Sequence, residues 1–299
     1  MVRNREDIMK KASNMYKGLL GLFFGLIVLG IGNQAPAQGD TWATKTSRPT
    51  AVSGSAAGII DGILYVIGGQ VSGEGGSINV VEAYDPVSDT WTTKAPIPKA
   101  RSFAAPGVIN GKLYVVCGID PFDISQVDIY DPVANSWSTA TNPMVNARGA
   151  VASGVIDGIL YVVGGDVFGQ NASVNTLRAY NSVADIWVLK ASIPTDPRQR
   201  AAVVVIDGKL YVIGGATCCS PLTILEIYDP VSDFWTPAPP SPKGKDGLVA
   251  GVIGGKFYAV SGLADPGNGI NTSTNENNEL KTPVIPVSPL WSLWFQVFI

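Results

Sequence analysis

The chain has 299 residues, a formal net charge of −3 and no histidine, and 15% of its residues are charged. This length suits one large all-β domain or two ordinary ones, and the 34 glycines and 21 prolines indicate many turns and strands. The lack of a basic block beyond the N-terminus argues against nucleic-acid binding. The lack of histidine removes the commonest general base, the commonest zinc ligand and every Ser/His or Cys/His pair.

The N-terminus has the features of an export signal. Three lysines precede an apolar run over residues 18–31, and the small residues Ala35-Pro36-Ala37 follow as a cleavage site. About 14 apolar residues are few for a membrane span. We expect a signal peptide over residues 1–37 and a secreted or periplasmic protein. The alternative is an uncleaved membrane anchor with the rest of the chain outside the cytoplasm, and this segment is the one membrane contact that we expect.

A nine-residue phrase of turn, strand and turn occurs five times, and Asp157–Gly165 is a clear copy. Asp-Gly suits a tight hairpin turn, because both of its residues tolerate positive φ. The following Leu-Tyr-Val-Val is typical of a short buried strand, and the final Gly-Gly lets the backbone turn away without a Cβ in the way. Cys117 replaces one such glycine and is expected to be a small buried residue. The glycines with this structural role are Gly68, Gly69, Gly164, Gly165, Gly214 and Gly215.

A second phrase follows each strand phrase and places a tyrosine seven residues before a tryptophan. Asp-Pro or Asn at its centre favours a turn, so this phrase predicts a second hairpin. The four pairs are Tyr84 and Trp91, Tyr130 and Trp137, Tyr180 and Trp187, and Tyr228 and Trp235. Two hairpins in a unit of 46–50 residues predict four-stranded blades. In the third copy we expect the strands at residues 150–156, 159–163, 176–180 and 186–189.

The two phrases at a period near 50 resemble those of the kelch-repeat family of β-propellers, over residues 42 to about 262. The resemblance implies an all-β propeller of four-stranded antiparallel blades, of which about five are recognisable. We therefore expect a propeller over residues 38–262 and a degenerate tail over residues 263–299. In this family, an isolated strand such as Asp40–Trp42 can complete the last blade.

The tail departs from both phrases, so we expect the fifth blade to be incomplete. Residues 271–278 are polar without alternation, and Pro283, Pro286 and Pro289 cannot donate ladder hydrogen bonds. These features argue against a third strand from this segment. The tail is a truncation, a shifted reading frame or a strand docked out of pattern.

Three arginines stand nine residues before the strand-phrase turn, a position where kelch proteins typically carry arginine. They are Arg101, Arg148 and Arg198, whereas the first copy has Val52 and the fifth has Lys245. Because arginine binds carboxylates through two parallel hydrogen bonds, these side chains are candidates to hold an anionic sugar or a peptide carboxylate. The alternative, which we favour, is an ion pair between blades or a hydrogen bond to strand carbonyls, because structural charge networks are common.

Aspartates after the Gly-Gly turns are the other candidates. Asp120, Asp166 and Asp265 supply the oxygen ligands that a hard cation prefers, but their offsets differ, so we favour turn capping and expect neither a metal nor a cofactor. Asp166 remains a candidate for ligand binding. The repeated tyrosines and tryptophans are expected to pack between blades rather than to bind sugars.

We expect a non-catalytic binding module for a protein or a carbohydrate. The ligand would meet the face that carries the loops between second and third strands and the blade connections, because most sequence variation lies there. Two kinds of enzyme occur among kelch proteins. Copper oxidases need histidine ligands and are excluded, whereas a periplasmic sugar-acid mutarotase or epimerase remains the alternative. Its site would combine one of the three arginines with Glu74 or Asp166.

Overall fold

The computed structural model describes residues 44–71, 76–122, 124–167, 172–217, 220–253, 256–260, 262–264, 272–273 and 277–280. The chain forms two compact units, residues 1–45 and residues 46–299, and all described strands belong to the second. The expected signal peptide and the Asp40–Trp42 strand lie outside the described residues. None of the described residues forms a helix long and apolar enough to cross a membrane.

Four sheets of the second unit are four-stranded and antiparallel, as expected for propeller blades. The first blade consists of β1 (Ala56–Ile60), β2 (Ile63–Ile67), β3 (Val81–Asp85) and β4 (Thr90–Lys94). The second consists of β5 (Ala105–Ile109), β6 (Lys112–Val116), β7 (Val127–Asp131) and β8 (Ser136–Thr139). The third consists of β9 (Ala152–Ile156), β10 (Ile159–Val163), β13 (Leu177–Asn181) and β14 (Ile186–Lys190). The fourth consists of β15 (Ala202–Ile206), β16 (Lys209–Ile213), β17 (Leu225–Asp229) and β18 (Phe234–Ala238).

The fifth blade has three described strands. They are β19 (Val249–Ile253), β20 (Lys256–Val260) and β23 (Asn277–Leu280). Two short hairpins extend loops of the third and fifth blades, namely β11 (Asp166–Val167) with β12 (Ala172–Ser173), and β21 (Leu263–Ala264) with β22 (Thr272–Ser273). The prediction of an all-β propeller of four-stranded antiparallel blades is confirmed.

The third strand of the fifth blade corrects one expectation, because the tail does supply it. Leu280 pairs with Phe257 in the register in which Tyr228 pairs with Leu210. The backbone of β23 can form this ladder without an alternating sequence, and its residues precede all three prolines of the tail. The polar composition therefore did not prevent pairing with the edge of β20.

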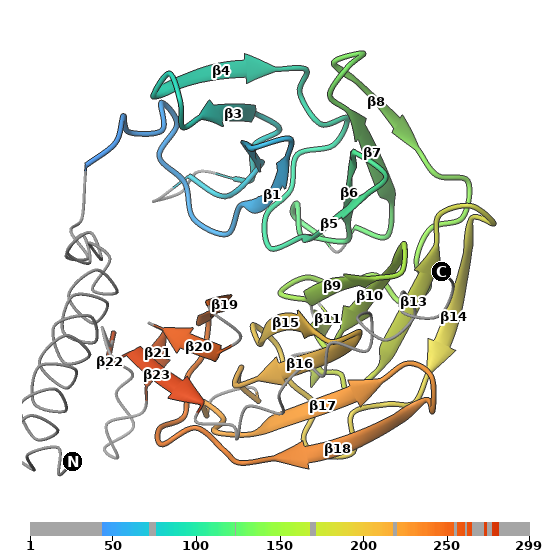
Figure 1. The fold of residues 1–299 in the computed structure, drawn as a ribbon. Coiled ribbons are helices and arrows are strands. Elements are labelled where there is room, and N and C mark those ends of the chain that lie inside the picture. Colours follow the sequence, from blue (N-terminus) through green and yellow to red (C-terminus); the bar gives the residue numbers. More distant parts are fainter. Residues whose placement is uncertain are drawn as a thin grey trace, which may run out of the picture. The chain divides into compact units, whose positions relative to one another are not determined.

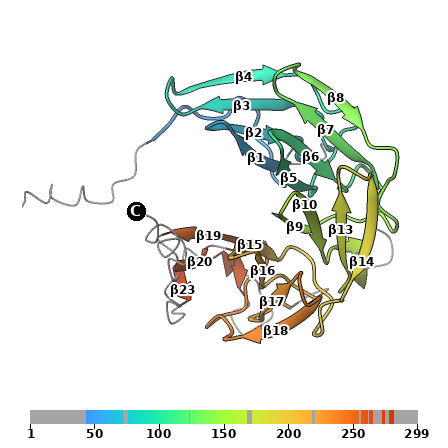
Figure 2. The same ribbon diagram turned by 45° about the vertical axis from the view of Figure 1, so that its right-hand side comes forward.

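Adjacent blades pack through their first strands, in the order β1, β5, β9, β15 and β19 (Figures 1 and 2). Each hydrophobic core is shared by two blades rather than enclosed in one. Tyrosines mark these interfaces: Tyr65 contacts Tyr130 with ring centroids 5.6 Å apart, and Tyr161 contacts Tyr228 at 5.9 Å. The alternation of polar and apolar strand residues is weak because each sheet is covered on both faces.

A repeated polar clamp joins the outer hairpins of neighbouring blades. In the fourth blade, the Tyr228 hydroxyl and the Ala191 N–H both donate to Asp233 Oδ1, at 2.6 and 3.0 Å. The Trp235 indole N–H donates to the Ala191 carbonyl at 2.7 Å. Ala191 directly follows the last strand of the third blade, so each clamp fixes one blade to the next.

The first blade forms the same clamp on Thr46. The Thr46 N–H donates to Asp89 Oδ1 at 3.0 Å, and the Trp91 indole N–H donates to the Thr46 carbonyl at 2.8 Å. Thr46 therefore has the hydrogen bonds of a residue that follows a blade's fourth strand, which is where the sequence from Trp42 onward would place it.

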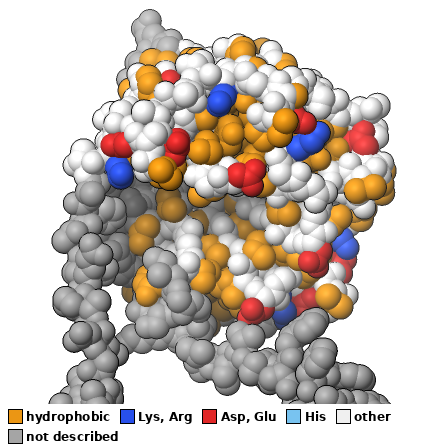
Figure 3. All heavy atoms as spheres, turned by 45° about the horizontal axis from the view of Figure 1, so that its top comes forward, with side chains coloured by type: hydrophobic (Ala, Val, Ile, Leu, Met, Phe, Trp, Pro, Cys, Tyr) orange, Lys and Arg blue, Asp and Glu red, His pale blue; other side chains and the backbone are white. Residues whose placement is uncertain are grey.

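The surface combines exposed apolar side chains with scattered charges. On the side seen in Figure 3, hydrophobic side chains lie between separate acidic and basic ones, and the basic side chains of the described residues lie apart from one another. Each outer hairpin also exposes a valine at its turn. These residues are Val87, Val133, Val183 and Val231.

Candidate functional site

The antiparallel topology gives the propeller two different faces. The turns between first and second strands and between third and fourth strands lie on one face, which we call the turn face. The loops between second and third strands and the blade connections lie on the other, which we call the loop face. Arg101, Arg148 and Arg198 each lie in a separate blade connection, four residues before the first residue of a first strand.

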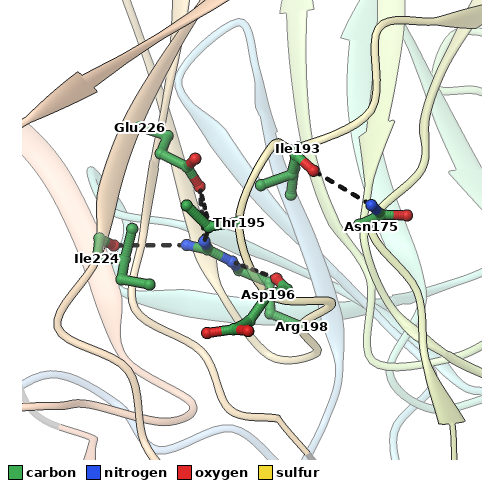
Figure 4. A network of polar contacts seen from close by, with 7 residues as sticks. All are labelled: Asn175, Ile193, Thr195, Asp196, Arg198, Ile224 and Glu226. Carbon is green, nitrogen blue, oxygen red and sulfur yellow. Dashed lines mark hydrogen bonds and ion pairs between the residues drawn. The ribbon is translucent and has the colours of Figure 1, made fainter.

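Two of these arginines form buried ion pairs inside their own blades, whereas we expected ion pairs between blades. Arg198 Nη2 lies 2.6 Å from Glu226 Oε2, and Arg101 Nη2 is paired with Asp128 Oδ2. In the fourth blade, Arg198 also donates to the Thr195 hydroxyl, which itself donates to Glu226, and to the Ile224 and Asp196 carbonyls (Figure 4). The guanidinium groups of both arginines are thus occupied by the protein itself.

Burial explains why these pairs are needed. Burial lowers the pKa of Arg101 and of Arg198, while the adjacent carboxylate, Asp128 or Glu226, raises it. An unpaired buried charge costs several kcal/mol, whereas a hydrogen-bonded partner offsets most of this cost. The two ion pairs therefore have a structural role.

Sequence reasoning missed the acidic half of this arrangement. Glu82, Asp128 and Glu226 each stand two residues before the repeated tyrosine and are almost fully buried. The sequence feature that could have revealed them is a charged residue that recurs at the same position of an otherwise apolar strand. In the first blade the cation is Arg48, whose Nε lies 2.5 Å from Glu82, and not a residue at the Val52 position.

The third blade departs from this pattern because Arg178 stands where the carboxylate stands elsewhere. Arg148 is 1% exposed and donates to the Thr176 hydroxyl, with Met144 Sδ 3.9 Å from its Nη2. Its Nε has no hydrogen-bond partner in the described part of the chain, and neither has the Nε of Arg178. Burial lowers the pKa of Arg148 to about 10; Cys117 opposes this shift, and Arg178 adds to it.

No contact between the remaining candidates is found in the part of the chain that the structure describes. Asp166 lies in β11 and is held by backbone pairing with Gly149, and no ion pair joins it to Arg148 among the described residues. Asp120 donates its backbone N–H to the Phe122 carbonyl. Glu74 and Asp265 lie outside the described residues. Within the described ranges, no group of three or more His, Cys, Asp or Glu residues is arranged to hold a metal ion.

Comparisons with known proteins match the repeat pattern. The family model described as the Kelch motif matches residues 51–98, 100–144, 147–194 and 197–242. No curated protein matches the chain. Among solved structures, one titled "Structure of YjhT" is similar, with a TM-score of 0.70 and 14% sequence identity over 80% of this chain and 84% of that chain. At this identity, the likeness shows the fold alone.

Proposed function

Because the chain belongs to the kelch-motif family of β-propellers, we propose that it is an exported binding module for a protein or a carbohydrate. The ligand meets the loop face. The observation that carries this proposal is the contrast between the two faces: the turn face repeats similar residues in the first four blades, whereas the loop face varies. Variable loops on a rigid frame suit recognition.

The described loops differ in both length and structure. The loop between β6 and β7 covers residues 117–126, whereas that between β10 and β13 covers residues 164–176 and contains its own hairpin. Phe122 in the first of these loops is 69% exposed, and Val145 in the next blade connection is also exposed. Aromatic side chains at such positions are common anchors in interfaces. The scattered basic side chains in Figure 3 support a partner other than nucleic acid.

The test compares two exposed apolar residues of the second blade. The protein would be screened on arrays of glycans and peptides, and each hit measured with Phe122→Ser and Val133→Ser. Val133 is 97% exposed on the turn face and serves as the matched control. We expect Phe122→Ser to weaken binding at least about tenfold, the effect of about 1.4 kcal/mol, and Val133→Ser to leave it unchanged. The opposite result would place binding on the turn face.

The alternative is a sugar-acid mutarotase or epimerase, and one observation favours it. Arg148 is a buried cation without a carboxylate partner among the described residues, as a site for a sugar acid would require. A mutarotase assay on reducing sugars and sialic acids tests this reading. Turnover that Arg148→Ala abolishes would overturn the binding module in favour of the enzyme.

A further inference from the structure

The third strands of the first four blades carry a charged residue at one equivalent position. Glu82 pairs with Val66, Asp128 with Val115, Arg178 with Val162 and Glu226 with Val212. Three of the four residues are carboxylates that bind the cation of their own blade. The third blade has Arg178 instead, so a buried cation, Arg148, faces a second cation.

The positions of Arg148 and Arg178 place both side chains near the interface between the second and third blades. Arg178 and Tyr180 alternate along β13 and so point to the same side of the third blade, and Thr176 directly precedes this strand. Tyr180 packs on Tyr114 of the second blade, with ring centroids 6.3 Å apart, and Arg148 donates to Thr176. The lowering of the pKa of Arg148 by Arg178 agrees with this proximity.

This interface has donors without acceptors. The Nε atoms of Arg148 and Arg178 are both buried and lack partners among the described residues, and Arg148 as a whole is 1% exposed. Arg178 is partly exposed, whereas the carboxylates at the equivalent positions are buried, so part of the Arg178 side chain contacts solvent. Two neighbouring guanidinium groups repel each other, and an anion between them would remove this cost.

We propose that Arg148 and Arg178, with the Thr176 hydroxyl, bind the carboxylate group of a small anionic ligand between the second and third blades. The ligand carboxylate takes the place that Asp128 and Glu226 take in the neighbouring blades. In those two blades, the space beside the arginine holds one carboxylate group. We therefore expect a carboxylate to fit the equivalent space better than the larger phosphate. Arg148 belongs to a blade connection of the loop face, but the site uses neither Phe122 nor Val145, so it does not depend on the binding module of the proposed function.

The experiment uses acetate as the probe on the full-length protein. Unfolding midpoints would be measured in sodium acetate, sodium phosphate and sodium chloride at equal ionic strength and pH. At several times the dissociation constant, acetate should raise the midpoint by roughly 2–4 °C over chloride. Equal midpoints in acetate and chloride would overturn the proposal, and a rise in phosphate without one in acetate would overturn the carboxylate class.

The decisive variant is Arg178→Glu, which gives the third blade the charge pattern of its neighbours. Without acetate it should unfold at a higher temperature than the natural protein, and it should lose the acetate response. Lys99→Glu makes the same change of charge at an exposed side chain and should keep the response. If Arg178→Glu responds to acetate as the natural protein does, the anion binds elsewhere and the proposal fails.

One further variant tests whether a side chain of the protein, rather than a ligand, supplies the negative charge beside Arg148. Cys117 Sγ lies 3.7 Å from Met144 Sδ on the same side of Arg148, and a Cys117 thiolate would supply the missing negative charge. We expect Cys117→Ser to keep the acetate response of the natural protein. If the response appears in Cys117→Ser and is missing from the natural protein, the thiolate occupies the place and the proposal is wrong.

Discussion

The third and fourth blades have the same four strands and the same aromatic clamp, but they treat a buried arginine in opposite ways. In the fourth blade, Arg198 is neutralised by Glu226 and surrounded by hydroxyl and carbonyl groups. In the third, Arg148 faces Arg178 and leaves Nε atoms without partners among the described residues. The blade therefore folds with either a carboxylate or a guanidinium at this position of its third strand. Other contacts must stabilise the blade.

Those other contacts are the shared cores and the clamps of the outer hairpins. Tyr180 and Tyr228 are both buried, and each donates to an aspartate, Asp185 or Asp233, at 2.7 and 2.6 Å. The polar cluster at the start of each blade can thus vary without loss of the fold. A position that can vary in this way is available for ligand binding, whereas the clamp is not.

The largest expected effect comes from breaking the fourth blade's pair. Glu226→Ala leaves Arg198 buried without its carboxylate and should lower the free energy of unfolding by about 3–5 kcal/mol. Urea denaturation measures this loss. The double variant Arg198→Met with Glu226→Leu removes both charges and should recover most of it. A loss well below 1 kcal/mol for Glu226→Ala would show that Arg198 is solvated, contrary to its burial.

A second comparison concerns the glycine that ends the second strand. Gly164 has φ +61°, and a Cβ there would lie 2.4 Å from the Arg198 carbonyl oxygen. Gly158 also has positive φ, but a Cβ there would meet nothing closer than Ile109 at 4.0 Å. Gly158→Ala should cost about 1–2 kcal/mol from its backbone conformation, and Gly164→Ala should cost about 1–3 kcal/mol more through overpacking.

The second blade provides the natural contrast to Gly164. Cys117 occupies the equivalent place with φ 65° and is fully buried, so this blade accommodates a Cβ there. Chemical denaturation of both glycine variants would measure the difference. If both variants lose the same free energy of unfolding, the backbone at Arg198 can shift to make room for a Cβ at position 164, and the predicted overpacking is absent.

The clamps predict a smaller, pH-dependent effect. Hydrogen bonds from the Tyr228 hydroxyl and then from the Ala191 N–H lower the pKa of Asp233. A lowered pKa in the folded state means that the stabilisation is complete above the unfolded value of about 3.9. It is lost as the pH falls through the lowered value. Asp233→Asn keeps the acceptor, as Asn135 does in the second blade, and should reduce the fall of the urea midpoint below about pH 4.

The converse substitution sharpens this test. Asn135→Asp should introduce the pH dependence that Asp233→Asn removes, because Tyr130 and Ala95 donate to Asn135 as their equivalents donate to Asp233. Identical pH profiles for the two variants and the natural protein would show that the clamp does not distinguish the ionised from the neutral acceptor.

The blades were predictable from the sequence because local signals fix them. Asp157-Gly158 and Gly164-Gly165 have the positive φ angles that their residues suggest, and the Tyr–Trp pairs lie across one hairpin. The β23 strand was missed because its pairing depends on the open edge of β20 and not on its own composition. Strand propensities of single residues cannot predict a strand whose conformation is set by pairing with the edge of another strand.

The candidate site was only partly predictable. The three arginines were recognisable by spacing, but their roles depend on residues in the third strand about 30 positions later. Arg178 could have been noticed as the one basic residue two before a repeated tyrosine. That Arg178 lies near Arg148 is indicated by the sheet register and by the burial of both Nε atoms, which a linear pattern does not contain.

The smallest expected effect comes from an ion pair of similar length at the surface. Lys209 Nζ lies 2.9 Å from Asp229 Oδ2, close to the 2.6 Å of Arg198 and Glu226, but 44% of the Lys209 side chain is exposed. Water and salt screen such a pair, and ordering the lysine costs rotamer entropy. Lys209→Ala should therefore leave the urea midpoint unchanged within error at physiological salt. A loss comparable to that of Glu226→Ala would mean that distance, and not burial, sets the contribution of these pairs, and the contrast between the third and fourth blades would then lose its energetic basis.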